Sequence, residues 1–162
     1  MSETENPLIE GRTAVIECLR QLMVASANAG VRRIHCVAPS FLDWPFDQSG
    51  VLEALVRWAK PPGRAMLLIA QDFDGVGRQH PRFTAWRRDW AHCIEALQPS
   101  EGERVELPTL LWAGMQALEV LDTERWRARW LRDPAELRAK AELCEAIAQR
   151  CEAAWPATTL GL

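Results

Sequence analysis

The chain of 162 residues contains no tyrosine, only three histidines, and lysine only at positions 60 and 140. No apolar run approaches the roughly 20 residues that a membrane-spanning helix needs. No two cysteines have the CxxC spacing of zinc and redox sites. A glycine-rich phosphate loop, a dinucleotide fingerprint and a Gly-x-Ser-x-Gly elbow are also missing. These absences exclude the common sequence motifs for zinc, nucleotides and serine hydrolysis.

What remains is the composition of one ordinary globular domain, with 48% hydrophobic and 25% charged residues. The five cysteines are odd in number and predict free, mostly buried thiols in a reducing compartment. The first residues, MSETENPLIEGR, are polar and acidic and lack the basic start and apolar stretch of a signal peptide. We therefore expect a cytoplasmic protein that does not insert into a membrane.

Positive charge is carried almost wholly by arginine, yet the net charge is −3. Arginine can hold phosphates with two parallel hydrogen bonds. Here the arginines are interleaved with aspartate and glutamate, a pattern that codon bias in a GC-rich genome explains more simply. A net negative charge does not attract nucleic acid electrostatically, and we expect a nucleic-acid partner to be unlikely.

Apolar periodicity predicts alternating helices and strands. Helical spacing covers residues 12–28, 50–59, 81–97 and 134–155, strand patterns cover 32–38, 65–70 and 103–107, and a β-hairpin follows at 115–131. This order predicts an α/β fold with a single layer of mixed β-sheet, about five to six strands and a late antiparallel hairpin, flanked by helices. Residues 1–10 form a flexible tail in this prediction, 11–155 one domain, and 156–162 a C-terminal tail.

The hairpin and the closing helix resemble one half of the phospholipase D superfamily, over residues 11–155. In that family the strand that enters the hairpin carries His-x-Lys-x4-Asp. Alignment of the family's apolar-apolar-Asp turn with Val120-Leu121-Asp122 puts Met115 at the histidine position and Ala117 at the lysine position. Of the degenerate motif Met115, Ala117 and Asp122, only Asp122 matches.

The family's chemistry uses one histidine as the nucleophile on phosphorus, a second as general acid, and lysines to hold the phosphate charge. Methionine cannot transfer a proton and alanine cannot stabilise an oxyanion. The resemblance thus implies a non-catalytic binding, regulatory or structural module. It also implies a homodimer, because half-length members generally pair around a two-fold axis, and exposed Trp44, Trp112 or Trp130 could supply the apolar patch.

The stretch His80-Pro81-Arg82-Phe83 and the ending Thr158-Thr159-Leu160-Gly161-Leu162 are also similar to an uncharacterised bacterial group. Domains of that group occur alone or behind acyltransferase domains. This second resemblance implies no activity.

A relocated phosphate-ester hydrolase site is the enzymatic alternative. His80 and Arg82 follow an acidic loop with Asp72 and Asp74 at the end of strand 65–70, where open α/β sheets usually bind ligands. The cleft of interest would lie beside Met115, Asp72 and His80. A capping or surface role for His80 is the favoured interpretation, because no partner motif accompanies it.

A third hypothesis places an anion or nucleic acid on Arg125, Arg127 and Arg129, with Arg132 extending the same basic edge. We favour instead pairing of these arginines with Glu119 and Glu124 across the hairpin.

No cofactor or metal is expected. His35 and His92 lack a second histidine at ligand spacing, and Cys36 is predicted to be a packed core thiol. The acidic residues of the loops could converge on a divalent cation, but we favour the interpretation that they are separate, solvent-exposed carboxylates. These residues are Asp43, Asp47, Asp72 and Asp74.

Overall fold

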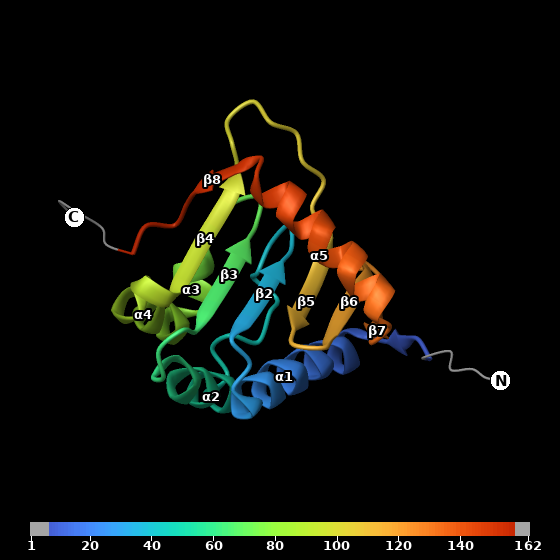
Figure 1. Cartoon of the computed structure of the whole chain (residues 1–162), viewed down its shortest axis with the longest axis horizontal. Coiled ribbons are helices and arrows are strands. Elements are labelled where there is room, and N and C mark those ends of the chain that lie inside the picture. The colour runs from blue at the N-terminus through green and yellow to red at the C-terminus, as the bar shows by residue number, and fades with distance from the viewer. Residues whose placement is uncertain (1–6, 158–162) are drawn as a thin grey trace.

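A single mixed β-sheet of eight strands organises residues 7–157, the part of the chain that the computed structural model describes (Figure 1). The elements are β1 (Ile9–Glu10), α1 (Arg12–Ala29), β2 (Arg33–Val37), α2 (Ser49–Ala59), β3 (Ala65–Ile69), α3 (Val76–Gln79), α4 (Pro81–Asp89), the 3-10 helix η1 (Ala91–Cys93), β4 (Ile94–Pro99), β5 (Thr109–Ala113), β6 (Gln116–Asp122), β7 (Arg127–Leu131), α5 (Pro134–Ala148) and β8 (Cys151–Ala153). The strand order is β1-β7-β6-β5-β2-β3-β4-β8. The pairs β2–β3 and β3–β4 are parallel, and every other pairing among the described strands is antiparallel.

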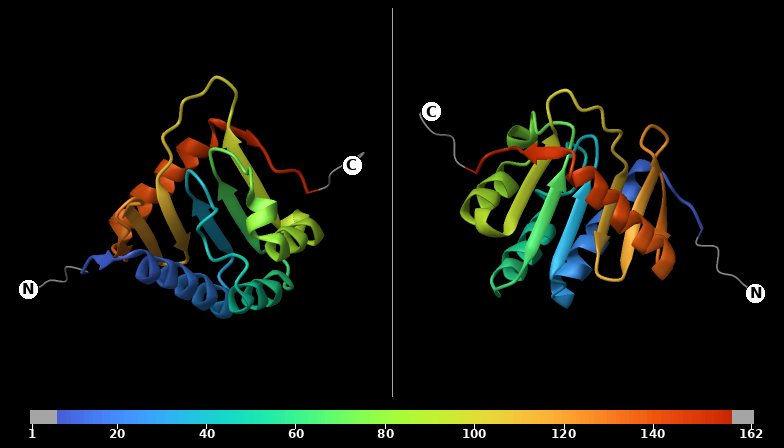
Figure 2. Two further views of the ribbon diagram at one scale, coloured as in Figure 1. Left: turned by 180° about the vertical axis from the view of Figure 1, so that it is seen from behind. Right: turned by 45° about the horizontal axis from the view of Figure 1, so that its top comes forward.

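The two faces of the sheet are covered unequally. On one face α1, α2 and α4 pack on a large core that includes Ile34 and Cys36 of β2. On the other face α5 alone crosses the sheet obliquely and covers the ends of the central strands, where Val37 and Ile69 contact its apolar stripe (Figure 2). Alternate residues of each strand serve the two cores, as the pleat requires.

Several local predictions are confirmed. The helix of residues 12–28 is α1, and Gly30 ends it in the left-handed conformation at φ 73°, with its N–H bound to the Ala27 carbonyl. The strands at 32–38 and 65–70 are β2 and β3, and the helix at 50–59 is α2. The hairpin consists of β6 and β7, and a β-bulge between Val120 and Asp122 precedes its turn.

The α/β class is correct, but the sheet has more strands than predicted. One additional strand, β1, lies within residues 1–10, which the sequence assigned to a tail, and it pairs with β7. A second, β8, begins at Cys151, where the apolar stripe predicted a continuing helix. Both are short edge strands of two and three residues, and their pairing partners, not their own pattern, define them. Residues 1–6 and 158–162 lie outside the described part of the chain.

The helix predicted at residues 81–97 is wrong in its second half. Helix α4 ends at Asp89, and Ile94–Pro99 forms β4 beside β3. Trp90, Ile94 and Leu97 have helical spacing, but parallel pairing with a buried strand overrides that local signal. The strand predicted at 103–107 is also absent, and the chain forms β5 a few residues later, antiparallel to β2.

All five cysteines are free, as predicted. Cys36 is fully buried, and burial raises the pKa of its thiol far above the ordinary value, so it is inert as a nucleophile. Of the three tryptophans expected to be exposed, Trp44 is buried, whereas Trp112 and Trp130 are half-buried. Trp112 stacks on His35 with ring centroids 4.3 Å apart, and the Arg132 guanidinium lies 4.9 Å from the Trp130 ring. Across residues 7–157, no helix has the length and apolar character needed to cross a membrane.

The start of α5 provides a test of the fold. The Asp133 carboxylate accepts a hydrogen bond from the Glu136 backbone N–H at 3.1 Å and caps the helix. We expect Asp133→Ala to lower the free energy of unfolding by about 1 kcal/mol, because a helix donor loses its partner. Urea denaturation measures this change. Asp133→Asn keeps a capping oxygen and should stay close to the wild type; equal losses in both variants would contradict the capping role.

Candidate functional site

The degenerate motif lies at a structural position that offers no reacting group. Met115 is 77% exposed in the turn between β5 and β6, and Ala117 is fully buried among the residues that α5 covers. Asp122 accepts backbone hydrogen bonds from Glu124 at 2.9 Å and Arg125 at 3.0 Å, which hold the hairpin turn. The hydrogen bond from Arg125 lowers the pKa of Asp122, the largest of several causes.

The three residues of the expected cleft do not meet. Because β5 runs antiparallel to β2, Ala113 lies beside Ile34 at the start of β2, and Met115 follows it at that end of the sheet. Asp72 follows β3, whose last residue pairs with Val37 at the opposite end. A site that contains both Met115 and Asp72 is therefore not formed.

His80 is a buried core residue, neither a surface nor a capping histidine. Its side chain is 4% exposed, its Nε2–H donates to the Phe41 carbonyl at 2.8 Å, and its ring meets Phe46 edge-on at 5.8 Å. The cap of α4 comes from Asp47, whose Oδ1 accepts from the Phe83 N–H at 2.7 Å. Asp47 therefore performs the capping role predicted for His80, and it lies 36 residues before Phe83 in the chain.

The other candidates around His80 lie at the surface. Arg82 is exposed and reaches Asp47 at 3.7 Å. Asp72 accepts from the Asp74 N–H at 2.9 Å in an exposed turn. Asp43 forms an ion pair with Arg12 at 3.0 Å. Within residues 7–157, no three or more histidine, cysteine, aspartate or glutamate side chains gather as a metal site would require.

The hairpin arginines divide into two groups. Arg129 lies in an ion network in which Glu119 accepts from Arg129 Nε at 2.9 Å and from Lys140 Nζ at 2.7 Å. Burial raises the pKa of Glu119, but the hydrogen bonds from Lys140 and Arg129 outweigh it, and the pKa lies below its ordinary value. Arg125 and Arg127 are exposed near the turn, and Arg127 reaches Glu10 at 3.5 Å.

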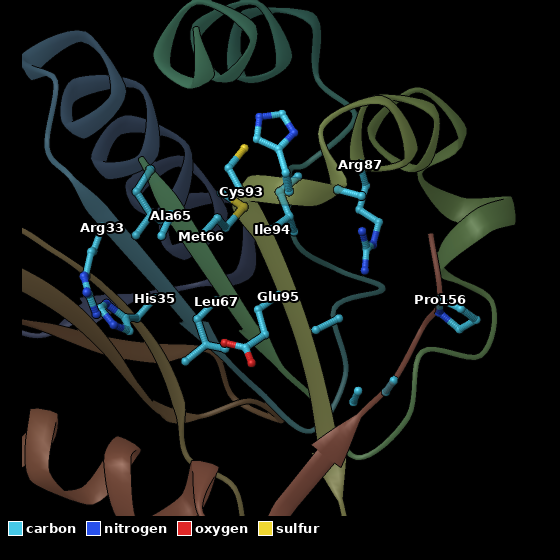
Figure 3. Close-up of a pocket in the computed structure, with 16 residues that line it drawn as sticks. Arg33, His35, Ala65, Met66, Leu67, Arg87, Cys93, Ile94, Glu95 and Pro156 are labelled. Atoms are coloured by element: carbon cyan, nitrogen blue, oxygen red, sulfur yellow. The ribbon is translucent and has the colours of Figure 1, made fainter. Parts of the chain in front are cut away.

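A groove that sequence reasoning missed opens where α5 no longer covers the sheet. It has a volume of about 600 Å³ and lies over the first residues of β2, β3 and β4 (Figure 3). His35, Leu67 and Glu95 form one row across these strands, since His35 pairs with Leu67 and Leu67 with Glu95. Arg87 of α4 and Pro156 close the groove at the sheet edge.

Two side chains of the groove, those of the half-buried His35 and the buried Arg87, have unsatisfied polar atoms. Among the described residues, His35 Nδ1 and the Arg87 nitrogens Nε and Nη1 have no hydrogen-bond partner. Burial, and secondly Arg33, lower the pKa of His35, which favours a neutral imidazole. The signal for Arg87 in the sequence was weak, because an arginine between Trp86 and Arg88 resembles any helix-surface cation.

Comparison with known proteins shows a similar fold in another context. A scan against protein-family models and a search of curated proteins find no match. Among solved structures, TrmBL2, an archaeal chromatin protein with a novel mode of DNA binding, is similar at a TM-score of 0.59 and 10% identity. The match covers 93% of this chain and 55% of that one, so this chain spans about half the length of TrmBL2. At 10% sequence identity, this similarity is evidence for a shared fold alone.

This neighbour corrects one expectation about partners. The net charge argued against nucleic acid, but a fold like this one occurs in a DNA-binding chromatin protein. Net charge describes the whole chain and not one surface of it, so it was too coarse a measure on which to exclude a nucleic-acid partner.

The Glu119 network yields a prediction about pH. We expect Glu119→Gln to reduce the free energy of unfolding by about 1–3 kcal/mol at neutral pH, because two cations lose a charged acceptor. A depressed pKa stabilises the fold above the unfolded-state value of about 4.5, and this contribution disappears as the pH falls through the lower folded-state pKa. Urea denaturation from pH 7 to pH 3 should show a smaller acid loss in Glu119→Gln than in the wild type. The exposed Glu124→Gln serves as control, and identical pH profiles for Glu119→Gln and the wild type would refute the network's role.

Proposed function

We propose that this chain is a non-catalytic, phospholipase D-like binding module. The supporting observation is the state of the two aligned positions, with Met115 exposed in a turn and Ala117 sealed beneath α5. Neither side chain can transfer a proton or hold a phosphate oxygen. The relocated site lacks support as well, because His80 donates its Nε2–H to a backbone carbonyl inside an aromatic cluster.

The proposal predicts no hydrolysis above the buffer rate with phosphodiester and phosphomonoester chromogenic substrates. The assay compares the wild type with His80→Gln, which keeps a donor for the Phe41 carbonyl, and with Arg82→Ala at the exposed neighbour. Hydrolysis by the wild type that either substitution abolishes, while circular dichroism shows an intact fold, would mean that the chain is an enzyme.

A second candidate function is contact with DNA through the hairpin. The observation that favours it is the fold likeness to a DNA-binding chromatin protein, together with exposed Arg125, Arg127 and Arg132, which are distributed along β7 from the hairpin turn to the residue after the strand. Arginine that is free to reach phosphates releases condensed counterions and gives salt-dependent binding. Arg129 is excluded from this set, because two carboxylates, Glu119 and Glu136, hold it. Arg127 and Arg132 are more exposed, although Arg127 reaches Glu10 at 3.5 Å and Arg132 donates to Gln116 at 3.2 Å.

If the hairpin contacts DNA, duplex DNA should bind with an affinity that falls steeply with salt. Replacing Arg125, Arg127 and Arg132 by alanine should reduce the slope of log K against log salt by up to about 3, near 0.9 for each lost phosphate contact. Fluorescence anisotropy between 50 and 200 mM salt, a range in which phosphate contacts have large effects, measures the slope. Arg78→Ala on α3 is the matched control; equal effects of both changes, or no binding, would exclude the hairpin as the interface.

A further inference from the structure

The strongest unexplained feature of the molecule is the buried guanidinium of Arg87. Its side chain is 7% exposed, and no acidic side chain in residues 7–157 forms an ion pair with it. Nη2 donates to the Trp155 carbonyl at 3.1 Å, and the guanidinium carbon lies 5.3 Å from the Trp155 ring. Nε and Nη1 remain without partners. A buried cation with unused donors is costly unless an anion or water satisfies it.

Arg87 lines the groove, and its Nε and Nη1 atoms have almost no solvent-accessible area of their own. Figure 3 shows the Arg87 side chain leaving α4 toward the space between β4 and the segment with Pro156. Strand β8 pairs with β4 only from Leu97 to Pro99, and Ala154 N–H then donates to the Ala96 carbonyl at 2.9 Å. After this contact Trp155 turns away and stacks on Phe73 at 5.4 Å. The edge beside Ile94 and Glu95 is therefore left open to a ligand.

From this geometry we propose that the groove binds a small molecule through one oxyanion group, a carboxylate or a phosphate, held by Arg87. This inference rests on the proposed binding module and names the chemistry of its ligand. Guanidinium donors form strong charge-assisted hydrogen bonds with such groups. The rest of the ligand lies over Leu67 and over His35, whose ring stacks on Trp112.

The charges that line the groove select against a polyanion. The exposed Glu95 carboxylate stands at the β4 end of the row and repels a second negative group, while Arg33 and His92 stand at the rim. His35 is held toward its neutral form, so it adds a hydrogen-bonding atom without positive charge. A ligand with a single oxyanion fits this arrangement better than a nucleic-acid backbone does.

Isothermal titration calorimetry of the full chain tests the proposal with two probes, inorganic phosphate and acetate, against chloride at matched ionic strength. The expected result is binding of at least one probe by the wild type and a loss of about tenfold or more in affinity for Arg87→Met. Arg88→Met, one residue along α4 and exposed, should bind as the wild type does. Phosphate and acetate arms distinguish the two sources of the oxyanion.

Stability measurements show whether Arg87→Met loses binding because it lacks the guanidinium or because it is misfolded. Without oxyanions this variant should unfold at or above the wild-type urea midpoint, because it removes an unpaired buried charge, and Glu95→Gln should bind the probe more tightly than the wild type. No binding by the wild type, or equal binding by Arg87→Met, would overturn the inference and assign the Arg87 donors to water. That outcome would not affect the prediction that the chain hydrolyses no phosphate ester. Conversely, phosphoesterase activity would overturn the proposed function but not the oxyanion site.

Discussion

Unequal coverage of the sheet is the constraint on which the rest of the structure depends. Three helices seal one face, and the other face receives only α5, a helix of 15 residues. At 1.5 Å per residue such a helix spans about 22 Å, too short to cover eight strands that lie about 4.8 Å apart. It protects the row with Val37, Ile69 and Leu97, whereas the next row, with His35, Leu67 and Glu95, is only partly covered.

The sealed face is held by aromatic contacts that join distant parts of the chain. Phe46 stacks on Phe83 at 4.2 Å, and Phe83 lies 6.0 Å from Trp155, so the loop after β2, the helix α4 and the C-terminal segment meet in one cluster. His80 belongs to this cluster. Its burial explains why a histidine with an attractive sequence context has no freedom to act on a substrate.

Trp155 connects this cluster to the groove. It adopts a positive φ of 46°, which costs a non-glycine residue strain that its surroundings must offset. Its ring packs on Phe73, and its carbonyl receives Arg87. The same residue that completes the aromatic core thus orients the guanidinium, which ties the position of the candidate anion site to the packing of the opposite face.

The sequence predicted elements whose own pattern determines them. The helix α1 with Gly30, the strand β2 and the cap Asp133 all carry a local signal that the fold retains. Prediction from the sequence failed where the structure of a segment depends on the strand that pairs with it. Residues 94–97 satisfy both helical and strand periods, and only their place beside β3 selects the strand. Edge strands as short as β1 have no pattern of their own to detect.

The candidate site could not be predicted for a related reason. The hairpin was a candidate because its residues align with a catalytic motif. In the structure Ala117 and Leu131 belong to the hydrophobic core between the sheet and α5. What distinguishes Arg87 is the lack of partners around two of its nitrogens, and that lack exists only after α4, β4 and Trp155 are assembled. A sequence records which donors a chain has, while the fold decides which of them remain unsatisfied. For this chain the residue most in need of a ligand is therefore one that periodicity placed on an ordinary helix.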